Sequence, residues 1–188
     1  MTDTAVVGEN VEIIQTKGPR SAFSWSATIA GALAAWAVAF IFISLGSGVG
    51  LAITSPFSGP SAAAMGIGGA IWLIISQTFG YAVGGYLAGR LRIRDHIPGP
   101  ETKFRDGAHG FMAWVIGVGI TSIAVAIAAW IATMHPQAAN AAQDAAQAAE
   151  AARKAAAYIS FWSFVALLFG AVAATLAGML GGELRDET

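Results

Sequence analysis

The densest group of titratable side chains in this chain lies in one polar segment, RLRIRDHIPGPETKFRDGAHG, from Arg90 to Gly110. Its candidate acids, bases and metal ligands are Asp95, His96, Glu101, Asp106 and His109. Together these groups could hold a divalent cation, but their spacing matches no standard zinc pattern. A structural interpretation is favoured, in which Asp106 caps the N-terminus of a helix. His109, at the mouth of a membrane helix, could also sense pH.

The same segment is strongly basic. A Lys or Arg side chain near anionic lipid headgroups gains about 1 kcal/mol, so the segment predicts contact with the membrane surface. The candidate headgroup contacts are Arg90, Arg92, Arg94, Lys103 and Arg105.

Other chemistry is sparse. The sequence has no cysteine, no Ser-His-Asp set, no glycine-rich phosphate loop and no helical metal-ligand pair, so we expect no enzyme, no catalytic residue and no cofactor or metal. Gln77 is the most polar residue in the apolar segments and is the candidate polar lining. It could hydrogen-bond to another helix at about 1 kcal/mol or contact a substrate. The apolar segments hold no ionisable residue, which argues against a proton-coupled pump.

The composition of the chain predicts which structural elements carry these residues. The 188 residues are 56% hydrophobic and only 11% charged, with a net charge of -1, which is typical of an integral membrane protein and excludes a basic nucleic-acid footprint. About 20 apolar residues cross the hydrocarbon core as a helix. Such runs occur at 27–49, 67–89, 110–133 and 158–180. Because unpaired backbone is costly in lipid, the predicted fold is all-α, with four transmembrane helices.

The distribution of positive charge predicts the orientation. Of the ten Lys and Arg residues, only Arg153 and Lys154 lie between the third and fourth spans, and the other eight lie on the opposite side. The positive-inside rule makes that side cytoplasmic, with both termini. The predicted parts are a cytoplasmic tail (1–24), three transmembrane helices with their loops (25–134), an Ala-rich extracytoplasmic helix (135–157), and the fourth transmembrane helix with a short cytoplasmic tail (158–188).

Small residues recur at a spacing of four in two of the spans, which predicts close helix packing in lipid. The candidate packing residues are Ser76, Gly80, Gly84, Gly85, Ala88, Gly89, Gly170, Ala174, Gly178 and Gly182. The spacing leaves open whether the partner helix belongs to the same chain, a second copy or another protein.

The ends of spans 2 and 4 also resemble each other. Aligned on Leu-Ala-Gly, Gly85 and Gly89 fall over Ala174 and Gly178. A tandem two-helix repeat would place a pseudo-twofold axis along the membrane normal. The alternative is a chance match between glycine-rich helices.

Between spans 3 and 4 the chain reads PQAANAAQDAAQAAEAARKAAA. Alanine is the best helix former, so this segment should be a helix that continues into span 4 and extends it by about 30 Å. One polar stripe follows the helix and is a candidate docking surface: Asn140, Gln143, Gln147, Glu150 and Lys154. Glu150 and Lys154 are spaced for an ion pair. The helix is either a solvated spacer or a docking arm.

The motifs SWSATIAGALAAW (24–36), GGYLAGRLR (84–92) and FRDGAHGFMAW (104–114) resemble those of a group of small four-span bacterial inner-membrane proteins of unknown function. Some of these carry a "PhnA-like" label. The resemblance implies a bacterial inner-membrane address, with the Gly-Arg and Arg-Asp-Gly-x-His-Gly corners on the cytoplasmic side. It implies no activity.

Three functions are compatible with these features. The first is a non-catalytic scaffold or accessory subunit, whose partners are the bilayer and other membrane subunits or a second copy. It would dock onto a larger inner-membrane complex, or self-associate, through the glycine-rich helix faces and the Ala-rich external helix. The second is a passive channel or small-solute transporter. Its candidate lining is Ser44, Ser47, Gln77 and Thr78. The third is a lipid- or stress-responsive membrane protein that acts through the basic segment.

Overall fold

The computed structural model describes residues 23–53, 62–93, 99–134 and 142–187, which form four α-helices and no strand. The helices are α1 (Trp25–Ile53), α2 (Ala62–Leu91), α3 (Pro100–Thr133) and α4 (Ala142–Asp186). Each is long and apolar enough to cross a membrane. The predicted fold class, an all-α membrane protein with four transmembrane helices, is confirmed.

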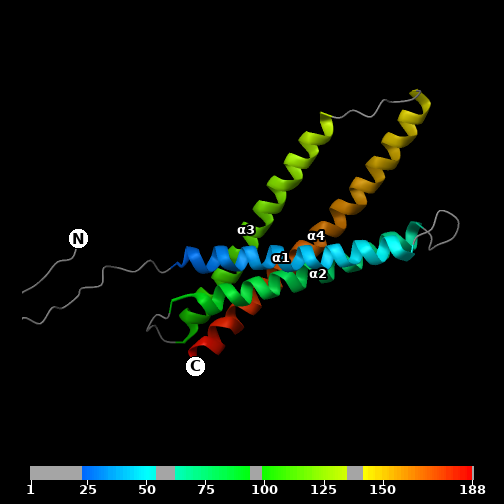
Figure 1. The fold of residues 1–188 in the computed structure, drawn as a ribbon. Coiled ribbons are helices and arrows are strands. Elements are labelled where there is room, and N and C mark those ends of the chain that lie inside the picture. Colours follow the sequence, from blue (N-terminus) through cyan, green and yellow to red (C-terminus); the bar gives the residue numbers. More distant parts are fainter. Residues whose placement is uncertain (1–22, 54–61, 94–98, 135–141, 188) are drawn as a thin grey trace, which may run out of the picture.

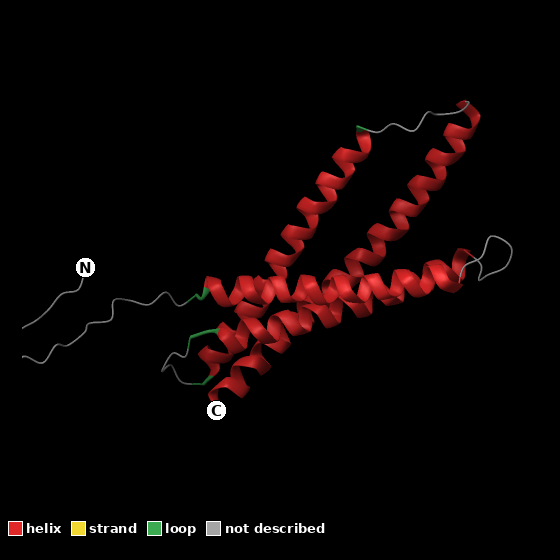
Figure 2. Cartoon of the chain, viewed as in Figure 1, coloured by secondary structure: helices red, strands yellow, loops and turns green. Residues whose placement is uncertain are grey.

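The four helices meet at one end, which we call the charged end, where α1 and α3 begin and α2 and α4 end. At the opposite, open end α1 and α2 stay side by side, whereas α3 and α4 lean away from them (Figure 1). Figure 2 shows short described loop segments at the charged end, before α1, after α2 and before α3. Helix α2 packs against α1, α3 and α4, whereas the described parts of α1 and α4 make no contact. Helix α2 is therefore the central element.

Helix α2 carries two neighbouring rows of small residues, and each row faces a different helix. Gly80 and Gly84 lie against α1, where a Cβ at Gly84 would overlap the carbonyl oxygen of Gly31. Gly85 and Gly89 lie against α4. Helices in lipid approach this closely only through small residues. The helices that these rows contact belong to the same chain.

Three other packing candidates also lie inside the bundle. Ala88 is fully buried against α1, and Ser76 is fully buried with its hydroxyl donating to the carbonyl of Trp72 (2.7 Å). On α4, Gly170 leaves room for the ring of Tyr81, since a Cβ at Gly170 would lie 2.7 Å from that ring. Small side chains thus decide the packing of α2 and α4.

The two helix ends that resemble each other in sequence are in contact. Gly85 packs against Ala174 and Gly89 against Gly178, and these are the pairs that the repeat alignment superposes. When a twofold axis relates two units, equivalent residues meet at the axis. Helices α2 and α4 run in the same direction, so their contact has the form that a tandem repeat with an axis along the membrane normal requires.

Helix α4 is a single element of 45 residues. It includes the Ala-rich segment from Ala142 and continues through Tyr158 without a break, so the predicted extension of the fourth span is confirmed. The first part of the predicted extension, with Pro136 and Asn140, lies outside the described residues.

The polar stripe of the extension is exposed where its side chains are described. Glu150 accepts a hydrogen bond from Arg153 at 2.9 Å and pairs with Lys154 at 3.4 Å. Gln147 is exposed on the same extension, and the side chain of Gln143 lies outside the described ones. Exposed pairs of this kind add a few tenths of a kcal/mol each to helix stability.

Helix α3 begins earlier than the third apolar run. The sequence predicts a span from Gly110, but the helix starts at Pro100, directly after Gly99, whose φ is 65°. Proline suits the first turn because it loses no intrahelical hydrogen bond there. Asp106 therefore lies six residues beyond the first residue of α3, and the prediction that it caps the helix is wrong.

Candidate functional site

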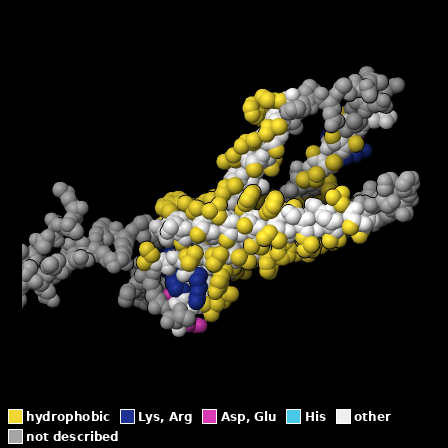
Figure 3. Space-filling model, viewed as in Figure 1, with side chains coloured by type: hydrophobic (Ala, Val, Ile, Leu, Met, Phe, Trp, Pro, Cys, Tyr) yellow, Lys and Arg dark blue, Asp and Glu magenta, His cyan; other side chains and the backbone are white. Residues whose placement is uncertain are grey.

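Charged side chains from three helices converge at the charged end of the bundle. Asp106 lies on α3 and Arg185 lies in the last turn of α4. Arg92 is the first residue after the end of α2. Figure 3 shows Lys, Arg and acidic side chains gathered at this end, while apolar side chains cover the helices beyond it. Asp106 and Arg92 are 1% and 3% exposed, so this is a buried ionic site.

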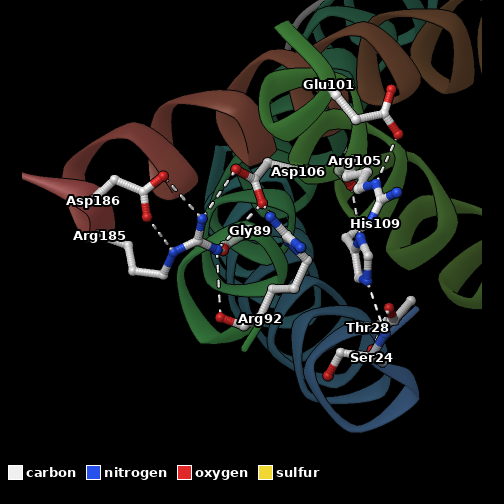
Figure 4. Close-up of polar contacts among 10 residues, drawn as sticks. All are labelled: Ser24, Thr28, Gly89, Arg92, Glu101, Arg105, Asp106, His109, Arg185 and Asp186. Atoms are coloured by element: carbon white, nitrogen blue, oxygen red, sulfur yellow. Dashed lines mark hydrogen bonds and ion pairs between the residues drawn. The ribbon is translucent and has the colours of Figure 1, made fainter. Parts of the chain in front are cut away.

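Both arginines bind the same carboxylate (Figure 4). Nε of Arg92 donates to Oδ1 of Asp106 at 2.6 Å. Nη1 and Nη2 of Arg185 donate to Oδ1 and Oδ2 of Asp106 at 3.2 and 3.3 Å. Arg185 also pairs with Asp186, through Nε at 2.9 Å. Two guanidinium groups and two carboxylates leave the cluster neutral, with Asp186 at its exposed edge.

Arg185 also closes the end of α2. Its Nη1 donates to the main-chain carbonyls of Gly89 (3.0 Å) and Arg92 (3.3 Å). The last carbonyls of a helix have no partner within the helix, so a buried helix end needs donors from elsewhere. One side chain on α4 thus satisfies the backbone of α2 and the carboxylate of α3.

Glycines on α4 make the cluster sterically possible. A Cβ at Gly182 would overlap the carboxylate of Asp106, and a Cβ at Gly178 would lie 2.7 Å from the carbonyl oxygen of the same residue. Both glycines were packing candidates from the sequence. Their missing side chains let α3 approach α4 closely enough for Arg185 to reach Asp106.

His109 connects α3 to the start of α1. Its Nε2 accepts the main-chain N–H of Ser24 at 2.9 Å, and Nδ1 lies 2.6 Å from the carbonyl oxygen of Arg105. Because Nε2 accepts a hydrogen bond, Nδ1 must carry the proton and donate to that carbonyl. The ring is 1% exposed and stacks on Phe23, with centroids 4.4 Å apart. The imidazole is therefore held neutral and oriented on both sides.

The first turn of α1 depends on this contact. The main-chain N–H and the hydroxyl of Thr28 both donate to the carbonyl oxygen of Ser24, at 3.1 and 2.9 Å.

We expect His109→Ala to speed hydrogen exchange at the Ser24 amide at least tenfold, because its acceptor is lost and the site opens. Amide exchange followed by NMR measures this. Ser26→Ala is the control, since the hydroxyl of Ser26 approaches only that of Ser24, at 3.4 Å; equal protection in His109→Ala would contradict the role.

The residues predicted to contact lipid headgroups lie in different environments in the structure. Arg92 is buried against Asp106, so its assignment to lipid headgroups is wrong. Lys103 is exposed and pairs with Glu183, and Arg105 pairs with Glu101 at 2.7 Å. Arg90 is half-buried. Arg94 lies outside the described residues.

The predicted metal ligands do not assemble where the chain is described. Residues 23–53, 62–93, 99–134 and 142–187 contain no group of three or more His, Cys, Asp or Glu side chains able to hold a metal ion. The Asp106 carboxylate is occupied by two arginines. Asp95 and His96 lie outside the described residues.

The candidate channel residues do not share one cavity. Gln77 lines a crevice between α2 and α3, whereas Ser47 lines a separate groove between the end of α1 and the start of α2. Ser44 is exposed, and the hydroxyl of Thr78 is buried with no hydrogen-bond partner among the described residues. In the part of the chain that the structure describes, Gln77 and Ser47 thus line two different cavities.

The ionic cluster itself was not predicted. Arg92, Asp106 and Arg185 are separated by 14 and 79 residues in the sequence, so no local spacing links them. The available signal was a carboxylate between two basic helix ends that resemble each other. As chemistry, the cluster stabilises a helix junction, because each charge is matched by an opposite charge.

The fold and this site define a four-helix membrane protein closed at one end by buried ion pairs. No family model matches the chain, and no curated protein or solved structure matches it either. The resemblance to the "PhnA-like" group stays a prediction.

Proposed function

We propose that this protein is a non-catalytic membrane subunit, a scaffold or accessory protein that binds another membrane protein or a second copy of itself at its open end. One observation carries the proposal: every described side chain of α3 from Ser122 to Ile131 is exposed. The inner half of α3, by contrast, packs into the bundle, with Ala113 at 1% exposure. About the outer third of this transmembrane helix is therefore available to a partner.

The exposed outer segment of α3 has the composition of a helix-packing surface. Ala124 and Ala128 lie four residues apart, one above the other on the same face, and both are exposed. Small residues at this spacing allow two helices in lipid to approach closely. The exposed extension of α4 lies at the same end of the molecule and adds a polar stripe (Figure 1).

The glycine rows are not available for this purpose. Helices α1 and α4 of the same chain already pack against the surfaces formed by Gly80, Gly84, Gly85 and Gly89. Self-association through them would require the bundle to open. The partner surface is thus assigned to α3 and the α4 extension.

The same proposal includes a cellular location and an orientation in the membrane. We place the protein in a bacterial inner membrane with the charged end in the cytoplasm, on the basis of the eight basic residues at that side and of the sequence resemblance. The ion-pair cluster would then lie near the cytoplasmic boundary of the membrane.

Substitution on α3 tests the function. The full chain, purified from native membranes in a mild detergent, should carry a stoichiometric partner or form a defined oligomer by native mass spectrometry. Ala128→Phe should reduce that occupancy about tenfold or more, because a bulky ring keeps the helices apart.

Ala37→Phe is the matched control, since Ala37 is exposed on α1. It should retain the partner. A wild-type protein that is monomeric and alone, or equal retention in both variants, would contradict the proposal.

A further inference from the structure

A crevice opens between α2 and α3 midway along the bundle. Its volume is about 360 Å³. It is lined by Gln77, Tyr81, Val118, Thr121, Ser122, Val125, Ala126, Ala129 and Leu167. Gln77 lies 12 residues from Met65 and 14 from Leu91, the two ends of the second span. The crevice therefore lies at the depth of the hydrocarbon core.

Tyr81 is built into this crevice. The residue is only 5% exposed, and its ring is held between α3 and α4. A Cβ at Gly117 of α3 would lie 2.9 Å from one ring edge, and a Cβ at Gly170 of α4 would lie 2.7 Å from the other. Two glycines thus make the space that fixes the ring and its hydroxyl.

Some polar groups of the crevice already donate a hydrogen bond within the chain, and others do not. The hydroxyls of Thr121 and Ser122 donate to the carbonyls of Gly117 and Val118, both at 2.9 Å, so their protons are used. In the described part of the chain the Tyr81 hydroxyl makes no hydrogen bond, and neither does the Gln77 amide. The donors left for a guest are the Tyr81 O–H and the Gln77 N–H groups.

Charge and size narrow the guest further. No Asp, Glu, Lys, Arg or His lines the crevice among the described residues, so a charged guest would lack a counterion at this depth. Small-molecule sites begin at about 300 Å³. The space suits a ring-sized group or a short acyl segment.

We propose that this crevice is a binding site for a neutral, membrane-dissolved molecule with a carbonyl group, which accepts a hydrogen bond from Tyr81 and is positioned by Gln77. The guest enters sideways from the bilayer between α2 and α3. The carbonyl can come from the ring of a lipid-soluble quinone or from the ester of an acyl lipid. The crevice shares outer α3 with the partner surface but uses another face of that helix: Ser122, Ala126 and Ala129 line the crevice, whereas Ala124 and Ala128 lie on a different face.

Native mass spectrometry of the full chain in detergent tests the site with three probes: decylubiquinone, dioctanoylglycerol and dodecylbenzene. One equivalent of a carbonyl probe should bind, and whichever carbonyl probe binds more tightly identifies the source. Dodecylbenzene, which has no acceptor, should bind more weakly. Tyr81→Phe should weaken carbonyl binding about five- to tenfold, because it removes one hydrogen bond and keeps the ring.

Two further variants complete the experiment. Tyr86→Phe is the matched control on the same helix, since Tyr86 does not line the crevice, and it should bind as the wild type does. Ala126→Phe should fill the crevice and abolish binding. Unfolding midpoints of all variants verify that each is folded. The proposal is overturned if neither carbonyl probe binds, if dodecylbenzene binds equally well, or if folded Tyr81→Phe binds as tightly as the wild type.

Discussion

Asp106→Asn is expected to destabilise the bundle by about 3–5 kcal/mol, because it leaves the guanidinium groups of Arg92 and Arg185 buried without the carboxylate that they share. The side chains of Arg92 and Asp106 are each 2% exposed, so water cannot replace the lost anion. The free energy of unfolding in SDS titrations of the detergent-solubilised chain measures the loss.

Glu101→Gln is the control for this variant. Glu101 pairs with Arg105 on the exposed side of the same helix, where an ion pair four residues apart contributes only about 0.3–0.5 kcal/mol. Similar stability losses in the two variants would show that burial of the Asp106 cluster has no energetic consequence. A large loss in Asp106→Asn alone supports the role of the cluster as the closure of the bundle.

Gly85→Ala and Gly89→Ala should each separate α2 from α4 and cost about 1–3 kcal/mol. A Cβ at Gly85 would overlap the carbonyl oxygen of Ala174, and one at Gly89 would overlap that of Gly178. Main-chain oxygens cannot rotate away as side chains can, so the helices must shift. The same SDS titration gives the loss of stability.

The matched control lies on the same helix. Gly68 is exposed and has nothing within 4 Å of an added Cβ. Gly68→Ala should therefore leave stability unchanged or raise it by up to about 1 kcal/mol, since alanine favours the helix. If Gly85→Ala behaved as Gly68→Ala does, the contact between α2 and α4 would not be as close as described.

The four spans could be predicted because the bilayer imposes a simple rule on each segment separately. Length and apolar content locate helices such as α1 without knowledge of the others. The continuation of the Ala-rich segment into α4 followed for a similar local reason, since no helix breaker lies between Ala142 and Tyr158.

The charged end could not be predicted by that rule. The apolar run of the third span starts at Gly110, so apolar content predicts no helix over the polar turns from Pro100. Those turns are helical because Asp106 and His109 are satisfied by Arg92, Arg185 and Ser24, which come from other helices. Contacts between distant residues leave no periodic pattern in the sequence.

The glycine rows were recognised from their spacing, but their direction was not. Rows one residue apart, as at Gly84 and Gly85, point to neighbouring faces of α2. Which face meets α1 and which meets α4 depends on the order of helices around the bundle. Spacing within one helix carries no information on that order.

The position of Arg185 has a consequence for how the chain matures during synthesis. Helices are made from the N-terminus onward, so Asp106 can first pair with Arg92, while Arg185 is added only with α4, the last of the four helices. Until then the end carbonyls of α2 lack the donor that Arg185 provides. The arrival of α4 in the membrane is thus the step that completes the junction.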